Sequence, residues 1–112
     1  HIKRLIQNIT HQEFNSVLLN EYPDGSVGMG WHSDDEKELG INPIIASVSL
    51  GAERDFLFRH KKDKSKEPVK ILLKHGSLLL MMGSTQHHWH HSLPIRRKVK
   101  EKRINLTFRN IV

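Results

Sequence analysis

Apolar and polar residues follow one another along this chain in short runs whose spacing is typical of β-strands. The clearest run is 103–109, where Ile104, Leu106 and Phe108 face one way and the polar residues between them face the other. Further strand-like runs, several of them bounded by turn residues, cover 14–22, 43–51, 54–59, 69–73 and 77–82. By contrast, 1–12 carries apolar residues at near-helical spacing. The pattern predicts a mainly β chain of roughly seven or eight short strands, arranged as a sandwich or jelly roll.

The composition narrows the class of protein. The chain has 112 residues, of which 37% are hydrophobic, so it is long enough for one globular domain with its own core. It contains no cysteine, which excludes a disulfide framework, a thiolate zinc site and a cysteine nucleophile. No run approaches the roughly 20 apolar residues of a membrane span, and no signal peptide is visible.

The net charge of +6 and the pI near 9.8 favour a polyanionic partner such as nucleic acid, although many soluble proteins are basic without one. Six of the eight side chains in 59–66 are basic if His60 is counted, a density that is typical of a solvated loop. A second basic stretch covers 96–103. Both stretches are candidates for contacts to a nucleic-acid backbone, and an ordinary solvated surface is the alternative.

His32 and Asp34 stand two positions apart, so in extended backbone their side chains point to the same side. A histidine from a distant strand would complete a 2-His-1-carboxylate set, the ligand arrangement of non-heme Fe(II) oxygenases. Four histidines occupy five positions around Trp89 and supply the candidates: His87, His88, His90 and His91. The pattern does not choose among these four. For His32 and Asp34, a solvated acidic turn is the alternative interpretation.

Two arginines pose a physical problem within 103–109. Arg103 and Arg109 share a strand face with Asn105 and Thr107, and guanidinium groups would be unfavourable on a face packed into an apolar core. Either this face is solvated or it surrounds an anion. The two arginines lie about 20 Å apart along a strand, so two long side chains leaning toward each other could hold both ends of a short dicarboxylate. Beside a 2-His-1-carboxylate iron, such a ligand is typical of a 2-oxoglutarate-dependent oxygenase.

Six segments of the sequence resemble the AlkB family of Fe(II)/2-oxoglutarate dioxygenases, in particular its nucleic-acid dealkylating members of the human duplex-repair type. They follow the family's order over about residues 14 to 112: FNSVLLNEYPDG, WHSDDEKELG, PIIASVSLGAERDFLFRHK, HGSLLLMMGSTQ, HWHHSLP and RINLTFR. The resemblance implies a double-stranded β-helix, or jelly roll, forming one catalytic domain over 1–112, with 1–13 as the end of a preceding helix and 14–112 as the core. The N-terminal nucleotide-recognition lid of complete members is expected to be absent from this sequence.

The resemblance also implies roles for individual residues. The metal ligands would be His32, Asp34 and His91, the last directly before Ser-Leu-Pro, and Asp35 would be the acid near the alkylated base. The residues that would bind 2-oxoglutarate are Asn20, Tyr22, Arg103, Asn105, Thr107 and Arg109. The basic run, as the tip of a hairpin, would contact nucleic acid through Arg59, Lys61, Lys62, Lys64 and Lys66.

The function that the resemblance implies is oxidative demethylation of N-alkylated bases in DNA, or in RNA. Fe(II), 2-oxoglutarate and O2 would convert the N-methyl group of 1-methyladenine or 3-methylcytosine to formaldehyde, with release of succinate and CO2. Both lesions are cationic, so a carboxylate such as Asp35 would favour them over the uncharged bases. This role implies an intracellular protein, nuclear in a eukaryote or cytoplasmic in a bacterium. The alternatives are the same oxygenase chemistry on a protein or small molecule, and a nucleic-acid-binding module with a vestigial metal site.

Overall fold

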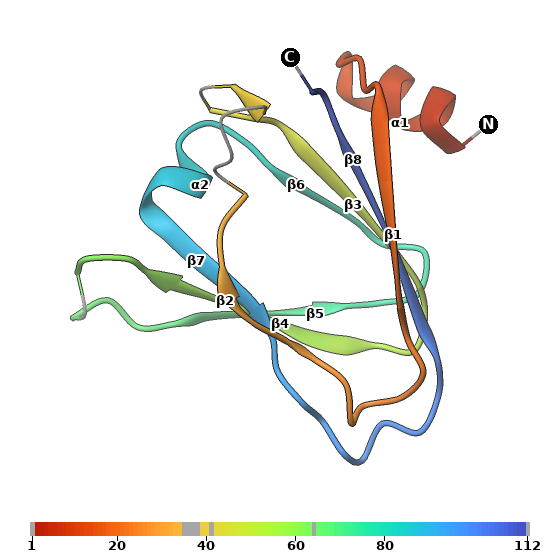
Figure 1. Cartoon of the computed structure of the whole chain (residues 1–112), viewed down its shortest axis with the longest axis vertical. Helices are drawn as coiled ribbons and strands as arrows, with labels where there is room; N and C mark the ends of the chain where they lie inside the picture. The colour runs from red at the N-terminus through yellow and green to blue at the C-terminus, as the bar shows by residue number, and fades with distance from the viewer. Residues whose placement is uncertain (1, 35–38, 41, 64, 112) are drawn as a thin grey trace.

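The computed structural model describes residues 2–34, 39–40, 42–63 and 65–111 and shows two facing antiparallel β-sheets (Figure 1). The strands of the first sheet lie in the order β1 (Ser16–Tyr22), β8 (Arg103–Arg109), β3 (Ile45–Gly51) and β6 (Leu78–Met81). Those of the second lie in the order β2 (Met29–His32), β7 (Trp89–Leu93), β4 (Arg54–His60) and β5 (Val69–Leu73). Each connection between consecutive strands crosses from one sheet to the other, except the β4–β5 hairpin. This winding is that of a jelly roll, so the predicted mainly β fold is confirmed.

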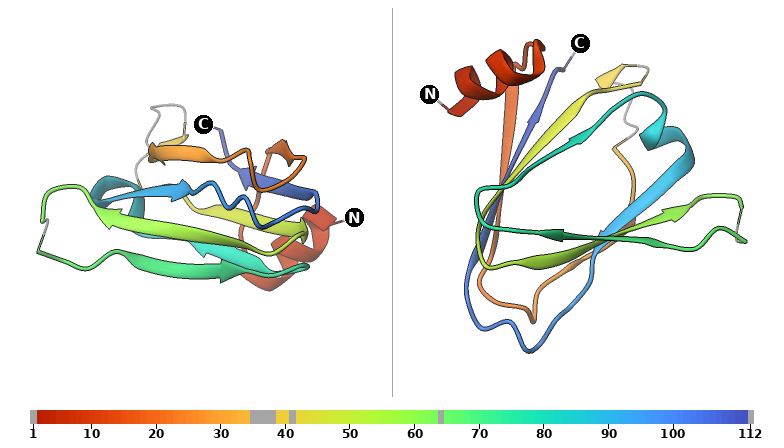
Figure 2. Two further views of the ribbon diagram at one scale, coloured as in Figure 1. Left: turned by 90° about the horizontal axis from the view of Figure 1, so that it is seen from below. Right: turned by 180° about the vertical axis from the view of Figure 1, so that it is seen from behind.

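The alternation in β8 decides what lies on each side of the first sheet. Phe108 is buried on the side that faces away from the second sheet, where it packs with Phe14 and with Ile6 of α1 (Ile2–Thr10). The views of Figures 1 and 2 show α1 against this outer side. Because side chains alternate along a strand, Thr107 points to the inner side, toward the space between the sheets.

The space between the sheets holds both an apolar cluster and a pocket. Leu39, Ile45, Phe58 and Met81 form the buried cluster, which stabilises the contact between the two sheets. The polar face of β8 lines the pocket. The fold therefore buries a row of polar side chains inside the molecule, where they need partners or a ligand.

Two glycines and a buried arginine close the end of the molecule where β1 leads into β2. A Cβ atom at Gly25 would collide with the carbonyl oxygen of Arg96, and one at Gly28 would collide with that of Leu93. Arg54 is 1% exposed, and its guanidinium donates hydrogen bonds to carbonyl groups in the β1–β2 connection and in the β7–β8 connection. The glycine-rich approach to β2 thus permits close packing of backbone against backbone.

The structure contains three elements that the pattern does not predict. The strand β2 has four residues, and β7 carries two adjacent histidines, so neither shows a recognisable alternation. The helix α2 (Thr85–His88) is too short for a helical period. The bounds of the other six strands agree with the prediction to within two residues at each end. No helix in the described part of the chain is long and apolar enough to cross a membrane.

Candidate metal centre and adjoining pocket

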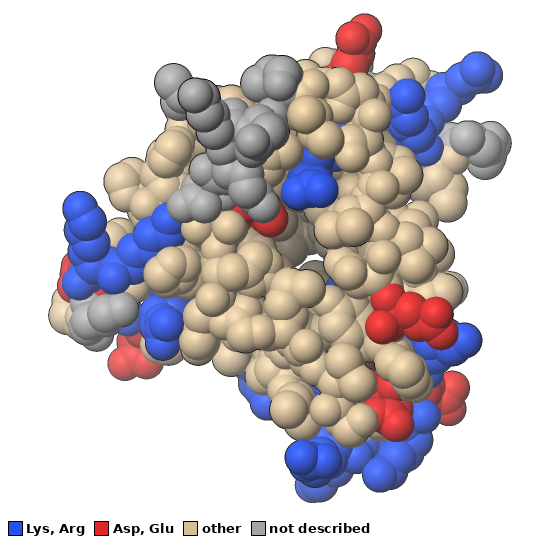
Figure 3. All heavy atoms as spheres, in the orientation of Figure 1, with Lys and Arg blue, Asp and Glu red and all other residues tan. Residues whose placement is uncertain are grey.

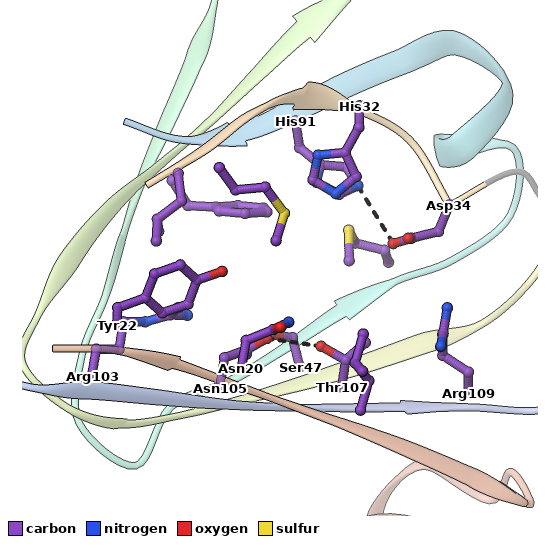
Figure 4. A pocket seen from close by; sticks show the side chains of 15 residues that line it. Asn20, Tyr22, His32, Asp34, Ser47, His91, Arg103, Asn105, Thr107 and Arg109 are labelled. Carbon is purple, nitrogen blue, oxygen red and sulfur yellow. Dashed lines mark hydrogen bonds and ion pairs between the residues drawn. The ribbon is translucent and has the colours of Figure 1, made fainter. Parts of the chain in front are cut away.

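Three of the predicted ligands meet between β2 and β7 (Figure 4). His32 ends β2 and pairs across the two strands with His91 of β7, while Asp34 follows His32 by two positions. The two imidazole rings stand edge to face with their centroids 4.3 Å apart. One ligand atom from each of the three residues lies within 4.8 Å of the others. The structure thus brings His32, Asp34 and His91 together as a group that could hold a metal ion.

The surroundings leave both histidines able to offer a lone pair. His91 is 3% exposed, and burial, with lesser effects of His32 and His90, lowers its pKa to about 4. Its imidazole is therefore neutral at pH 7. His32 Nδ1 lies 2.9 Å from the carbonyl oxygen of Gly30, which can only accept a hydrogen bond. That nitrogen is therefore the donor, which leaves Nε2 as the atom of His32 that could bind a metal.

The chemistry of this donor set fits Fe(II). Two neutral imidazoles and one carboxylate on one side of a metal form the 2-His-1-carboxylate arrangement, which leaves coordination positions open for other ligands. Asp34 Oδ2 lies 3.7 Å from His91 Nε2, and the Asp34 side chain is only 18% exposed. Because this carboxylate is mostly buried, water screens its charge only weakly, and its attraction to a bound cation is stronger.

The structure separates His91 from the three histidines beside it. His87 and His88 belong to α2 and are exposed. His90 alternates with His91 along β7, so its side chain points away from the space between the sheets. Of these four histidines, His91 alone lines the pocket.

A pocket of about 80 Å³ adjoins the three ligands (Figure 4). Its apolar lining consists of Leu18, Met29, Phe56, Met81 and Leu93. Its polar lining comes from β1, β3 and β8 and consists of Asn20, Tyr22, Ser47, Arg103, Asn105, Thr107 and Arg109. The six residues predicted to bind 2-oxoglutarate all belong to this polar lining.

Arg103 and Arg109 stand at opposite ends of the polar lining, with Arg103 beside Tyr22 and Arg109 nearer to Asp34 (Figure 4). Arg103 is 3% exposed, and its Nη2 donates to the Ser49 hydroxyl at 3.0 Å. The Nε atoms of Arg103 and Arg109 are buried without a hydrogen-bond partner among the described residues. Burial lowers the pKa of Arg103, yet a guanidinium remains a cation at neutral pH. Buried N–H donors of this kind fit an anionic ligand.

Hydrogen bonds hold the middle of the polar lining in place. The Asn105 amide donates to the Ser47 hydroxyl at 2.6 Å and to the Val48 carbonyl at 3.1 Å. The Thr107 hydroxyl donates to the Asn105 amide oxygen at 2.8 Å. The two bonds from Asn105 join the polar face of β8 to β3, and the Thr107 hydroxyl is held along the same strand.

The basic residues predicted to contact nucleic acid lie on the β4–β5 hairpin, which projects from the body of the molecule in Figure 1. Arg59 stacks on Trp31, with its Cζ 4.3 Å from the ring centroid. The Lys61 ammonium donates to the carbonyl of Gln86 at 2.7 Å. These two cations are therefore held against the protein near the end of β4, where the hairpin loop begins.

The other predicted residues of the hairpin are exposed, with the Lys66 ammonium 6.0 Å from the centroid of the Trp89 ring, or lie outside the described residues. Lys62 and Lys66 are exposed. Lys64 and Asp35, the predicted acid near the alkylated base, lie outside the residues that the structure describes.

Sequence reasoning missed Gln86, a buried residue that touches the metal-ligand group. Its amide oxygen accepts a hydrogen bond from the backbone N–H of Asp34 at 2.7 Å and lies 3.3 Å from His91 Nε2. No pattern signals this role, because 52 positions separate Gln86 from Asp34 along the chain. A single glutamine beside a run of histidines reads as part of a polar loop.

Comparisons with known proteins point to one family. A model of the 2OG-Fe(II) oxygenase superfamily matches residues 1–109. The human DNA oxidative demethylase ALKBH2 is 50% identical over 117 residues, a match that covers 99% of this chain and 45% of that protein. The human alpha-ketoglutarate-dependent dioxygenase alkB homolog 3 is 44% identical over 117 residues, with 98% of this chain and 41% of that protein covered. The chain thus spans less than half the length of these curated relatives.

A solved structure supports the fold independently. The structure of OsALKBH1 matches with a TM-score of 0.70 at 24% identity, over 97% of this chain and 62% of that one. At this level of identity the likeness concerns the fold, and it agrees with the winding of the two sheets described above.

Proposed function

Because this chain belongs to the 2OG-Fe(II) oxygenase superfamily, we propose that it carries the catalytic centre of a dioxygenase that demethylates alkylated DNA. One observation supports the chemistry most directly: the His32–Asp34–His91 group and the buried guanidinium of Arg103 line the same pocket. The DNA substrate is supported by human ALKBH2, the DNA oxidative demethylase that is 50% identical to this chain.

In this proposal the three ligands bind Fe(II), and 2-oxoglutarate lies along the polar lining. With 2-oxoglutarate and O2, bound Fe(II) supplies the oxidation that converts an N-methyl group to formaldehyde while 2-oxoglutarate becomes succinate and CO2. Arg103 binds the carboxylate at the Tyr22 end of the pocket, and Arg109 balances the negative charge at the end nearer to Asp34. Asn20, Asn105 and Thr107 line the pocket between these two ends.

The surface charge supports a nucleic-acid substrate. Lys and Arg side chains gather over the β4–β5 hairpin and over the β7–β8 connection in Figure 3. We propose that the basic hairpin binds phosphates without sequence preference: Arg59, Lys61, Lys62, Lys64 and Lys66. The positive charge of 1-methyladenine and 3-methylcytosine makes them the preferred lesions, with Asp35 as the acid that favours a cation. The target base has to leave the duplex stack to reach the metal centre, and a damaged base does so more easily.

The test measures succinate and formaldehyde together. The protein is incubated with Fe(II), 2-oxoglutarate and ascorbate, with and without a DNA oligonucleotide that contains 3-methylcytosine. Production of both compounds that depends on the oligonucleotide and is lost in Asp34→Ala would support the proposal. An RNA oligonucleotide of the same sequence then decides between the two nucleic acids.

Two outcomes would contradict the proposal in different ways. Succinate without formaldehyde, unaffected by any oligonucleotide, would mean the same chemistry on a protein or small molecule. Salt-sensitive DNA binding that is equal in the protein and in His32→Ala, with no succinate from either, would mean a nucleic-acid-binding module with a vestigial metal site.

A further inference from the structure

Gln86 is a polar side chain buried at 1% exposure, and its contacts explain why it is there. A buried amide needs hydrogen bonds at both its oxygen and its nitrogen. Its nitrogen donates to the sulfur of Met81 at 3.4 Å. Its oxygen accepts from the backbone N–H of Asp34 at 2.7 Å and stands 3.3 Å from His91 Nε2. One side chain thus contacts two of the three candidate metal ligands.

These contacts matter because of where Asp34 lies. The paired residues of β2 and β7 end at His32 and His91, and Asp34 comes two positions after the last paired residue of β2. The hydrogen bond from Asp34 to Gln86 therefore continues the connection beyond the strand pair. It joins the segment that carries Asp34 to the segment that carries His91.

Two hydrogen bonds from Lys61 hold the backbone of α2, the helix that contains Gln86. The Lys61 ammonium donates to the Gln86 carbonyl at 2.7 Å, and the Lys61 N–H donates to the His88 carbonyl at 2.8 Å. These two bonds hold α2 against the end of β4, where the hairpin loop begins. Gln86 is thus held in place through hydrogen bonds to both its main chain and its side chain.

We propose that Gln86 is a positioning residue that holds Asp34 against His91 at the separation a metal ion requires. It acts through the Asp34 backbone N–H and does not itself bind the metal. His91 Nε2 would bind the metal through its lone pair, and the Gln86 oxygen would keep its hydrogen bond to the Asp34 N–H. Outer partners of this kind typically change metal affinity by about 10- to 100-fold. The inference rests on the metal site of the proposed function.

The first experiment measures Mn²⁺ binding to the metal-free protein by calorimetry, with Mn²⁺ as a stable substitute for Fe(II). Gln86→Met keeps the length of the side chain and removes the amide, whereas Gln86→Glu keeps an oxygen acceptor at the same position. We expect Gln86→Met to weaken Mn²⁺ binding by about 10- to 100-fold and Gln86→Glu to stay within about threefold of the unchanged protein.

Gln7→Met is the matched control. Gln7 also accepts a hydrogen bond from a backbone N–H, that of Phe14 at 2.9 Å, but it lies on α1 at the outer face of the first sheet. Gln7→Met should leave the affinity for Mn²⁺ unchanged. An affinity of Gln86→Met within about twofold of the unchanged protein, or an equal loss in Gln86→Met and Gln86→Glu, would overturn the proposal.

The second experiment needs no metal. Hydrogen exchange of the Asp34 amide, followed by NMR, should be slow in the unchanged protein and in Gln86→Glu but fast in Gln86→Met. If Gln86→Met does not fold, Gln86→Leu is used instead. Fast exchange of Asp34 in the unchanged protein would overturn the positioning role. If the unchanged protein fails to bind Mn²⁺, the metal site of the proposed function is wrong, and the exchange rates alone decide whether Gln86 holds Asp34.

Discussion

Arg54 lies over the ring of Tyr22, with its Cζ 5.8 Å from the ring centroid, and both residues are buried. Arg103 approaches the same ring, with its Cζ 5.4 Å from the centroid. The Tyr22 ring thus lies near both the arginine that bonds to the β1–β2 and β7–β8 connections and the arginine that lines the pocket. The aromatic ring lets two buried cations stand close together, because each is attracted to its π-system.

Tyr22 should ionise only above the ordinary pKa of a tyrosine, which is about 10. Burial raises its pKa, and the opposing effects of Arg103 and Arg54 are smaller. Since Tyr22 is the only tyrosine in the sequence, a titration of tyrosinate absorbance reports this single group. The midpoint in urea-unfolded protein should return to about 10. Equal midpoints in the native and the unfolded protein would contradict the burial of the phenol.

The same shift fixes the sign of a pH dependence of stability. The pKa of Tyr22 in the folded state lies above that in the unfolded state, so its stabilising effect is complete below a pH of about 10. It is lost as the pH rises through the folded pKa. Tyr22→Phe cannot ionise, and its free energy of unfolding, measured in urea at several pH values, should fall less steeply above pH ~10.

Replacing Arg54 by methionine should lower the free energy of unfolding by about 2–4 kcal/mol. The guanidinium donates to the carbonyls of Val27 at 2.8 Å and Pro94 at 2.9 Å, and the substitution would leave both without this partner. Arg97→Met, a change of the same kind at an exposed position of the β7–β8 connection, should alter stability by less than about 0.5 kcal/mol. Urea unfolding of both variants measures the difference. A similar loss in the two would mean that the hydrogen bonds of Arg54 contribute little.

The fold could be predicted where the sequence alternates. The bounds of β8 match the predicted strand at both ends, because its apolar side chains pack under α1 and its polar side chains face the pocket. The sequences of β2 and β7 do not show this alternation of apolar and polar residues. Their pairing is irregular between Met29 and His32, so spacing along the chain does not give the position of each side chain.

The metal site could be predicted only in part for the same reason. His32 and Asp34 lie close together in sequence, so their spacing alone suggests a shared direction. The choice of His91 depends on its pairing with His32 across β2 and β7, which no local pattern reveals. Gln86 depends on a contact across 52 positions and could not be found from the sequence at all.

Arg103→Lys should weaken the binding of 2-oxoglutarate by about 10- to 100-fold, the loss of one or two hydrogen bonds to a charged group. The ammonium of lysine is shorter and lacks the planar fork that binds a carboxylate through two N–H groups. Calorimetry with Mn²⁺ in place of Fe(II) measures the affinity without turnover. Arg97→Lys serves as the control for the same exchange at an exposed position. Unchanged affinity in Arg103→Lys would exclude Arg103 as a carboxylate ligand.

Neutralising one exposed lysine of the hairpin should reduce the salt dependence of DNA binding. If Lys62 contacts one phosphate, Lys62→Gln should make the slope of log K against log[salt] less negative by about 0.9, and it should do so for DNA of any sequence. Lys3→Gln removes the same charge from α1, which lies on the far side of the molecule from the hairpin tip (Figure 1), and should leave the slope unchanged. Fluorescence anisotropy of a labelled oligonucleotide between about 50 and 200 mM salt gives the slopes. Equal changes in both variants would mean that DNA responds to the overall net charge and that the hairpin has no particular role in binding.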